Sequence, residues 1–308
     1  MYRSVLVPLD GSPSAEFAIP VAQGIARRTN GSVHLVHVHV PLSTAATSRT
    51  AAVPFYGEWD VEAKEHEADY LTALRQRLAP APDVTVDQRL EEGSIVETLV
   101  RCTGEVPTDL VVMTTHGRGP LARAWLGSVA DGVARRSRIP VLLLRPTADP
   151  EPMGEHLFRK VLIPLDGSSL GEQILPHAIA LGALADAHFT LVRVVSPLVL
   201  TGYAPTPEGM LTDAAYGPDL ELLIQDAEEY LRGVAAPLRE RGLSVETQVV
   251  AEMQPATGIL EFAREKPADL IAMATHGRTG ISRLVLGSVA DKVLRGTTAP
   301  ILLYRPRE

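Results

Sequence analysis

The feature that most constrains this chain is an internal repeat, because a repeat determines the architecture before any local structure is assigned. Three segments recur in the same order: VLVPLDGS at 5–12 returns as VLIPLDGS at 161–168, DLVVMTTHGR at 109–118 as DLIAMATHGR at 269–278, and LGSVAD at 126–131 unchanged at 286–291. The repeat predicts two similar domains, residues 1–147 and 159–308, each of ordinary domain size. Residues 148–158 contain Pro150 and Pro152 and are predicted to be the linker.

The composition narrows the classes of protein to which the chain can belong. Apolar residues make up 45% and charged residues 21%, and no run of 18 apolar residues occurs, so we expect a globular protein without a membrane span. The net charge is −8: residues 1–147 hold 15 basic and 16 acidic side chains, and residues 148–308 hold 14 and 21. Nucleic acid is therefore not an expected partner, because its binding depends on neutralising phosphates.

The N-terminus and the cysteine content bear on the compartment. The first residues enter a strand-like run directly and lack the pattern of a secretory signal peptide. Cys102 is the single cysteine, so it forms no disulfide within the chain, and we expect it to be a small buried apolar side chain. We expect a cytoplasmic protein.

Short apolar runs alternate with stretches of helical period in both halves. Strands are predicted near 3–8, 33–39, 84–90, 109–113, 140–145, 160–164, 189–195, 245–250, 269–273 and 300–304, and first-half helices near 14–29, 60–79, 94–105 and 126–137. The pattern predicts an α/β fold in which each half is a five-stranded parallel sheet with helices on both faces. Two stretches, 41–58 and 196–217, do not fit the alternation and are predicted to be either lids or binding loops, or disordered segments.

The repeated motifs follow strands whose carboxyl ends would lie together. Asp10 and Asp166 come after the first strand of each half, and Thr-His-Gly comes after the fourth. A strand order of 3-2-1-4-5 places these ends side by side, where open α/β sheets bind ligands. The carboxylate could accept hydrogen bonds from a ribose or a base. A glycine lets backbone amides approach phosphate, and the following Gly-Ser, at 127–128 and 287–288, opens a helix whose N-terminus binds anions.

Each piece also has a purely structural interpretation. Asp-Gly-Ser is ordinary helix-capping sequence, and Gly-Ser before Val-Ala-Asp could be a turn with an N-cap. A histidine after a strand is more often structural than catalytic, and loop arginines either clamp phosphate or lie in solvent. The residues concerned are His116, His276, Arg118, Arg123, Arg278 and Arg283. The recurrence of the whole set at matched spacing in both halves favours a binding site.

Other chemistry receives little support from the sequence. His37 and His39 share a face of the second strand, but no third ligand is evident, so no metal site is expected. No Gly-Lys-Ser/Thr follows the glycine loops, and no Gly-x-Ser-x-Gly motif occurs. No convincing pair of nucleophile and base is left, so an enzyme is not expected from these motifs.

Both halves resemble the universal stress protein family in a tandem two-domain form. The resemblance rests on Val-Pro-Leu-Asp-Gly-Ser, on Thr-His-Gly-Arg, and on Gly, nine residues, then Gly-Ser. It implies a Rossmann-like, adenine nucleotide alpha hydrolase-like fold and the binding of ATP, alone or with Mg²⁺ or Mn²⁺. The residues that it implies for the nucleotide are Pro8, Asp10, Val38, Met113, His116, Gly117, Gly127, Ser128 and Val129 in the first half, and Pro164, Asp166, Val194, Met273, Ala274, His276, Gly277, Gly287, Ser288 and Val289 in the second.

The chain departs from the family pattern at the first glycine of Gly-x-x-Gly, which is Thr114 in one half and Ala274 in the other. If that backbone needs positive φ or a close approach to phosphate, a Cβ costs about 1 kcal/mol and a β-branched side chain more. We therefore expect tighter ATP binding by residues 159–308 than by 1–147.

The resemblance also implies an assembly and a role. The fifth strands, 141–144 and 301–304, would join the halves as an internal pseudo-dimer and cover two strand edges. A further homodimer is left open, and the sequence names no protein partner. The leading hypothesis is a stress-response protein that acts through nucleotide-dependent interaction. The alternatives are a nucleotide-free structural module, and a slow ATPase or a relative of the ATP-pyrophosphatase and electron-transfer flavoprotein group.

Overall fold

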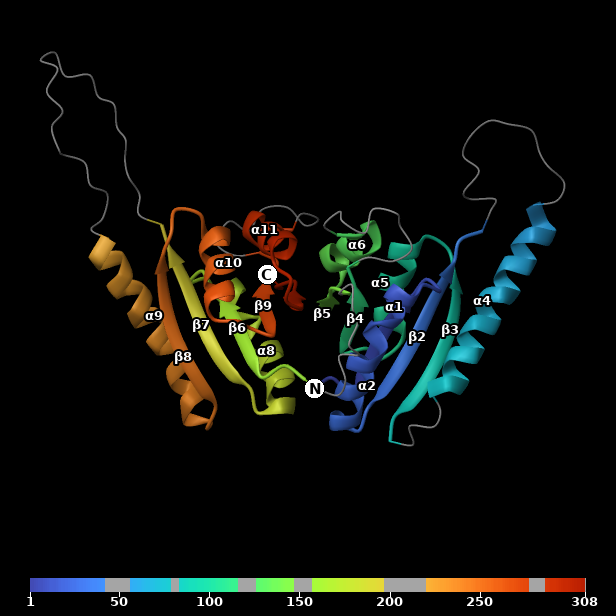
Figure 1. The fold of residues 1–308 in the computed structure, drawn as a ribbon, viewed down its shortest axis with the longest axis horizontal. Helices are drawn as coiled ribbons and strands as arrows, with labels where there is room; N and C mark the ends of the chain where they lie inside the picture. The colour runs from blue at the N-terminus through green and yellow to red at the C-terminus, as the bar shows by residue number, and fades with distance from the viewer. Residues whose placement is uncertain are drawn as a thin grey trace, which may run out of the picture.

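The structure is a computed structural model that describes residues 1–41, 56–78, 83–115, 126–146, 157–196, 220–276 and 286–307. Strands and helices alternate along both halves (Figure 1). The first half contains β1 (Ser4–Leu9), α1 (Pro13–Glu16), α2 (Ala18–Thr29), β2 (Ser32–His39), α4 (Tyr56–Leu78), β3 (Thr85–Glu92), α5 (Ile95–Glu105), β4 (Leu110–Thr114), α6 (Ser128–Arg136) and β5 (Val141–Leu144). The second contains β6 (Lys160–Pro164), α7 (Ser169–Glu172), α8 (Leu175–Gly182), η1 (Ala183–Ala185), β7 (His188–Val195), α9 (Leu220–Glu240), β8 (Ser244–Ala251), α10 (Pro255–Glu265), β9 (Leu270–Ala274), α11 (Ser288–Gly296) and β10 (Ile301–Tyr304).

The strands of the described residues form one ten-stranded sheet with the order β3-β2-β1-β4-β5-β10-β9-β6-β7-β8. Neighbouring strands within each half are parallel, as in the pairing of β1 with β2 from Ser4 opposite Ser32 to Leu9 opposite His37. Each half therefore has the order 3-2-1-4-5, which confirms the predicted α/β fold and places the first strand beside the fourth.

The two halves meet where the sheet changes direction. Strands β5 and β10 pair antiparallel, with Ile301 opposite Leu143 and Leu303 opposite Val141. All residues of both strands are buried. The fifth strands thus pair with each other across the two halves, and neither is an open edge of the sheet.

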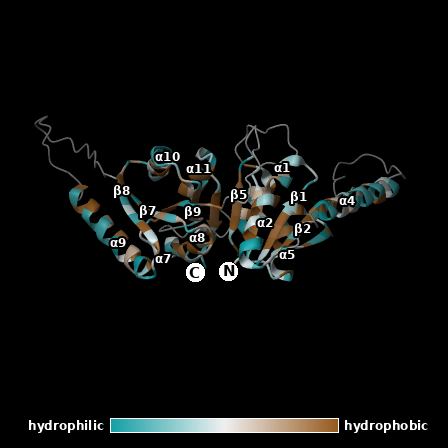
Figure 2. Ribbon diagram, turned by 60° about the horizontal axis from the view of Figure 1, so that its bottom comes forward, coloured by the Kyte–Doolittle hydropathy of each residue, from teal (hydrophilic) through white to brown (hydrophobic). Residues whose placement is uncertain are grey.

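Helices cover both faces of the sheet, and its central strands are apolar on both sides (Figure 2). One core lies beneath α2, α4, α8 and α9 and contains Leu71 and Leu231 from the two long helices. The other lies beneath α5, α6, α10 and α11 and contains Val133 and Val293. Among the described residues, no helix is long and apolar enough to cross a membrane.

The helix predicted over residues 14–29 was wrong in one respect, since the structure divides it into α1 and α2 at Phe17. Pro20 lies one turn after Glu16 and has no N–H, so an unbroken helix would lack the hydrogen bond to that carbonyl. The long helix of the first half begins at Tyr56 rather than near residue 60, within the stretch 41–58 predicted as a connection. Residues 42–55 and 197–219 lie outside the described residues.

Candidate nucleotide site

The Asp-Gly-Ser motif forms the same turn after the first strand of each half. The Asp166 Oδ1 accepts hydrogen bonds from the Ser168 N–H at 3.0 Å and from its hydroxyl at 2.6 Å, and the Ser168 Oγ accepts from Gly171 N at 3.0 Å. Gly167, at φ 83°, provides the left-handed conformation that the turn needs. Ser168 is thus the N-cap of α7, and Asp166 orients the capping hydroxyl.

The first half repeats this turn with closely similar distances. Asp10 accepts from the Ser12 N–H at 2.9 Å and from the Ser12 hydroxyl at 2.6 Å, and Gly11 has φ 78°. Ser12 in turn caps α1 through Ala15 N at 3.1 Å. The Asp-Gly-Ser motif therefore caps a helix in each half, as its structural interpretation predicted. Contact between the aspartates and a ligand depends on the pocket around them.

The Gly-Ser motifs lie at the start of α6 and α11 and are held against the end of the fourth strand. The Gly287 N–H donates to the Thr275 carbonyl at 2.8 Å, and the Gly127 N–H donates to the Thr115 carbonyl at 2.6 Å. A Cβ on Gly287 would lie 2.6 Å from Thr275 O, so only glycine fits this approach. The first turn of each helix, beginning at Ser128 or Ser288, directs its backbone N–H groups toward the carboxyl ends of the strands.

A cavity of about 540 Å³ opens at the carboxyl ends of β6, β7 and β9 in the second half. That volume lies within the range of pockets that hold cofactors. Nine of the ten residues that the resemblance implied for this half line the cavity: Pro164, Asp166, Val194, Met273, Ala274, His276, Gly287, Ser288 and Val289. The tenth, Gly277, lies outside the described residues. The structure therefore gathers the sequence motifs of this half around one cavity.

The residues implied for the first half occupy matching places. Pro8 and Asp10 are at the end of β1, Val38 is on β2, Met113 is on β4, and Gly127, Ser128 and Val129 lie at the start of α6. Because β1 and β4 are neighbours and Gly127 contacts the Thr115 carbonyl, these residues converge on the same edge of the sheet. His116, Gly117 and the arginines 118, 123, 278 and 283 lie outside the described residues.

The backbone at Thr114 and Ala274 has a conformation that does not require glycine. Both end ordinary parallel strands, with Thr114 opposite Leu144 and Ala274 opposite Tyr304. Neither has a positive φ, so neither position has the backbone strain that a missing glycine would have brought. The remaining difference between the halves at this position is side-chain volume, since Thr114 is buried and Ala274 lines the second cavity.

Some cavity residues were missed by the sequence reasoning. They come from β7 and from the helices around it: Val192, Arg193, Ser196, Leu223, Asp226, Pro255 and Ile259. The Arg193 guanidinium lies 4.9 Å from the centre of the Tyr230 ring, and the Tyr230 hydroxyl donates to Glu172 at 2.9 Å. The repeat gave no signal for Arg193, because the corresponding residue of the first half is His37.

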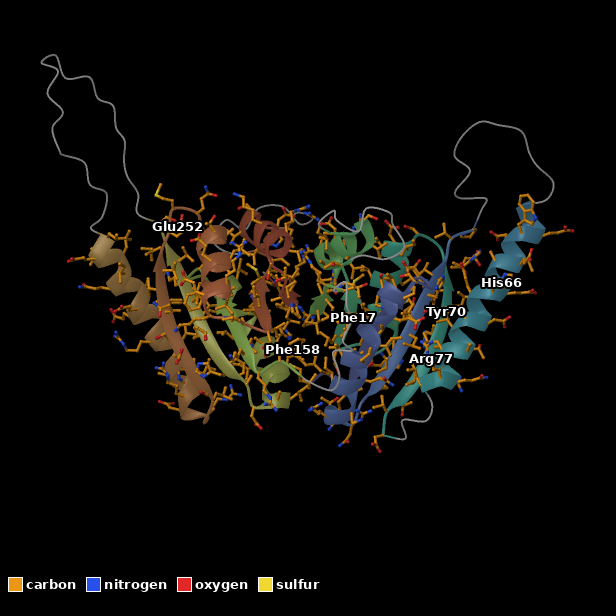
Figure 3. All side chains as sticks on the ribbon, viewed as in Figure 1. Phe17, His66, Tyr70, Arg77, Phe158 and Glu252 are labelled. Carbon is orange, nitrogen blue, oxygen red and sulfur yellow. The ribbon has the colours of Figure 1, made fainter. Side chains whose placement is uncertain are left out.

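The tyrosine–glutamate contact behind the aspartate also occurs in the first half. The Tyr70 hydroxyl donates to Glu16 at 3.0 Å, and Arg77 forms an ion pair with the same carboxylate. Both Tyr70 and Arg77 belong to α4 (Figure 3). Burial, followed by the negative charge of the glutamate, raises the pKa of Tyr70 above its ordinary value. The phenol therefore stays protonated and continues to donate, which ties the long helix to α1.

The histidines of β2 contact carboxylates of α4. The His39 Nδ1 lies 2.8 Å from Glu67 Oε2, and its Nε2 lies 3.4 Å from Asp60 Oδ1. The His37 Nε2 lies 3.4 Å from Glu67 Oε1. Among the described residues, no group of three or more histidine, cysteine or acidic side chains is arranged to hold a metal ion. These contacts fasten α4 to the sheet beside Val38.

A family profile described as the universal stress protein family matches residues 1–145 and 157–305. The chain belongs to this family. A universal stress protein of Methanocaldococcus jannaschii is 36% identical over 154 residues, which cover 49% of this chain and 85% of the relative. One from Mycobacterium tuberculosis is 27% identical over 311 residues, covering 98% and 97% of the two chains. A crystal structure of a universal stress protein from Archaeoglobus fulgidus has a TM-score of 0.71 at 17% identity and covers 99% of both chains, and at that identity it supports the fold alone.

Proposed function

We propose that this universal stress protein binds ATP at the carboxyl edge of one or both halves and acts through nucleotide-dependent interaction with a partner. The observation that carries the proposal is the second-half cavity, which is lined both by Asp166 and by the first turn of α11. A carboxylate accepts hydrogen bonds from ribose hydroxyls, and a helix N-terminus binds phosphate without a lysine. The cavity thus offers separate contacts for the two ends of a nucleotide.

The direct test is the identity of any ligand that copurifies. The full chain would be denatured and its released small molecules analysed by mass spectrometry, and the ligand-free protein would be titrated with ATP in a calorimeter, with and without Mg²⁺ or Mn²⁺. A universal stress protein that is 28% identical over 47% of this chain, with a TM-score of 0.34, has been crystallised with cAMP, so cAMP belongs among the ligands tested. Absence of any adenine nucleotide together with no heat of binding would favour a nucleotide-free structural module.

Two substitutions assign the sites. Ser128→Asp and Ser288→Asp place a carboxylate in the first turn of α6 or α11, where it suits the helix dipole but repels phosphate. We expect each variant to fold and to lose the site of its own half. Ser244→Asp, at the exposed amino end of β8, adds the same charge away from the cavity and should bind like the wild type. Unchanged stoichiometry in both site variants would show that the helix termini do not bind the ligand.

The same variants compare the halves. The chain carrying Ser128→Asp reports on the second site, and the chain carrying Ser288→Asp reports on the first. We expect the second site to bind ATP more tightly, because Ala274 leaves more room than Thr114. Turnover that is abolished by His276→Ala while binding is retained would instead support the ATPase alternative.

A further inference from the structure

The helices whose first turns would bind phosphate end against the opposite half of the molecule. Helix α11 begins at Ser288 in the second-half cavity and, with nine residues, spans about 13 Å. The Leu294 carbonyl in its last turn accepts a hydrogen bond from Arg145 Nη2 of the first half at 3.5 Å. Helix α6 has the reciprocal contact, in which the Arg135 carbonyl accepts from Arg305 Nη1 of the second half at 3.2 Å.

The antiparallel pairing of β5 with β10 explains why these contacts cross between the halves. Arg145 directly follows β5, and Arg305 directly follows β10. Since Ile301 lies opposite Leu143, the same register continued by two residues brings Arg145 opposite residue 299, in the segment that follows α11. By the same register Arg305 comes opposite residue 139, which follows α6. Each arginine therefore reaches the end of the other half's helix.

An ion pair also connects the two helices directly. Within each helix an arginine pairs with the aspartate one turn earlier, Arg135 with Asp131 at 2.7 Å and Arg295 with Asp291 at 2.8 Å. The Arg135 Nη2 then lies 3.7 Å from Asp291 Oδ1, across the boundary between the halves. Figure 1 shows α6 and α11 on the same side of the sheet near this boundary.

The hydrogen bonds of Arg145 and Arg305 are made to the last turns of the two helices whose first turns would bind phosphate. The last carbonyls of a helix lack partners within it, and a guanidinium there both satisfies one and opposes the negative end of the helix dipole. A cation held there would fix the end of a short helix and thereby the direction of the amides in its first turn. A phosphate at one end and an arginine at the other favour the same helix position.

We propose that each nucleotide site is completed by the other half: Arg305 is a positioning residue for the first site, and Arg145 is a positioning residue for the second. This inference rests on the proposed function, because it concerns the helices that would bind the phosphates. It implies that a substitution in one half changes binding in the other, which an independent pair of domains would not show.

The test uses two variants of the full chain, Ser128→Asp and Ser288→Asp, each of which has lost the site of one half and keeps the other. In the Ser288→Asp chain, which reports the first site, Arg305→Ala should weaken ATP binding by roughly two- to fivefold, the range of a charge at a helix end, and Arg145→Ala should not. In the Ser128→Asp chain the pattern should reverse. Lysine at either position should restore most of the affinity.

A matched control and a second measurement separate positioning from binding. Arg136→Ala removes an arginine that pairs with Glu97 of its own half at 3.1 Å, so it should not alter the second site. Hydrogen exchange of the ligand-free protein should show faster exchange in 128–136 for Arg305→Ala and in 288–296 for Arg145→Ala.

The outcomes distinguish the two proposals. If each arginine substitution speeds hydrogen exchange in the helix of the opposite half but the protein binds no ATP, the positioning role is retained and the proposed function is rejected. Binding losses or faster exchange confined to the arginine's own half, or equal in both halves, would overturn the inference. So would unchanged affinity and exchange in both arginine variants.

Discussion

The close approach of Gly287 to Thr275 gives a prediction that links stability to binding. The backbone of Gly287 has φ −54° and ψ 146°, a conformation open to any residue, so alanine meets no dihedral strain there. The obstacle is space: its Cβ would lie 2.6 Å from the Thr275 carbonyl oxygen, whereas ordinary contact begins at 3.4 Å. Gly287→Ala therefore requires the loop before α11 to move away from β9 by up to about 0.8 Å.

That movement has a cost in two places. The 2.8 Å hydrogen bond from Gly287 N to Thr275 O would lengthen, and a typical backbone hydrogen bond contributes about 1 kcal/mol net. Overpacking, together with the backbone shift that it forces, costs about 1–3 kcal/mol, and the lengthened hydrogen bond is part of that cost. We expect Gly287→Ala to lower the free energy of unfolding by about 1–3 kcal/mol and to weaken nucleotide binding in the second half, because the first turn of α11 moves with the loop.

Urea denaturation and calorimetry would measure the two effects on one preparation. Gly233→Ala is the control, since Gly233 lies within α9 with no neighbouring atom within 4 Å of its Cβ position. That change should be neutral or stabilise the protein by up to about 1 kcal/mol, because alanine favours a helix. If Gly287→Ala were as stable as the wild type and bound nucleotide unchanged, the assigned role of this contact would be wrong.

Three further predictions concern the boundary between the halves, the sheet and the cysteine. His177 packs on Tyr304 with ring centres 4.2 Å apart, and its burial, followed by the positive charge of Arg307, lowers the pKa of its imidazole. As the pH drops below 6.5, the unfolded chain therefore binds a proton at His177 before the folded chain does. The melting temperature should fall over this range, and it should fall less in His177→Gln. Leu143→Glu would bury a charge in the β5–β10 pairing, and small-angle scattering should show the halves separating, whereas an unchanged profile would contradict the pairing. Cys102 is buried and burial raises the pKa of its thiol, so a thiol reagent should label the native protein far more slowly than the denatured one; equal rates would refute this.

The sequence predicted the order of strands because that order follows from short-range patterns. Unbroken apolar runs at β1, β4 and β5 indicate strands covered on both faces, and helices between them require parallel neighbours. The repeat then supplied each assignment twice. The break at Phe17 was missed because apolar periodicity continues through it, and the signal that could have revealed it was Pro20.

The motifs of the candidate site were predictable for a different reason. Asp166, Gly287 and Ser288 stand at strand or helix ends, and ends on one edge of a parallel sheet converge whatever the rest of the chain does. Arg193 and Asp226 could not be placed in this way. Arg193 lies on a strand face and Asp226 on a helix, so their contribution to the cavity depends on how α9 packs, which periodicity leaves undetermined.

The fusion of two domains in one chain explains how the halves can differ at equivalent positions. In a symmetric homodimer every contact across the boundary occurs twice, because both subunits have one sequence. Here the two arginine contacts that cross the boundary have different lengths, 3.2 Å for Arg305 and 3.5 Å for Arg145. The halves also differ at the position of His37, which packs beside Tyr70 in the first half. The equivalent residue of the second half is Arg193, which packs beside Tyr230. Under the proposed function, a change at one of these positions would alter one site and leave the shared sheet intact, so the two sites could acquire unequal affinities without loss of the fold.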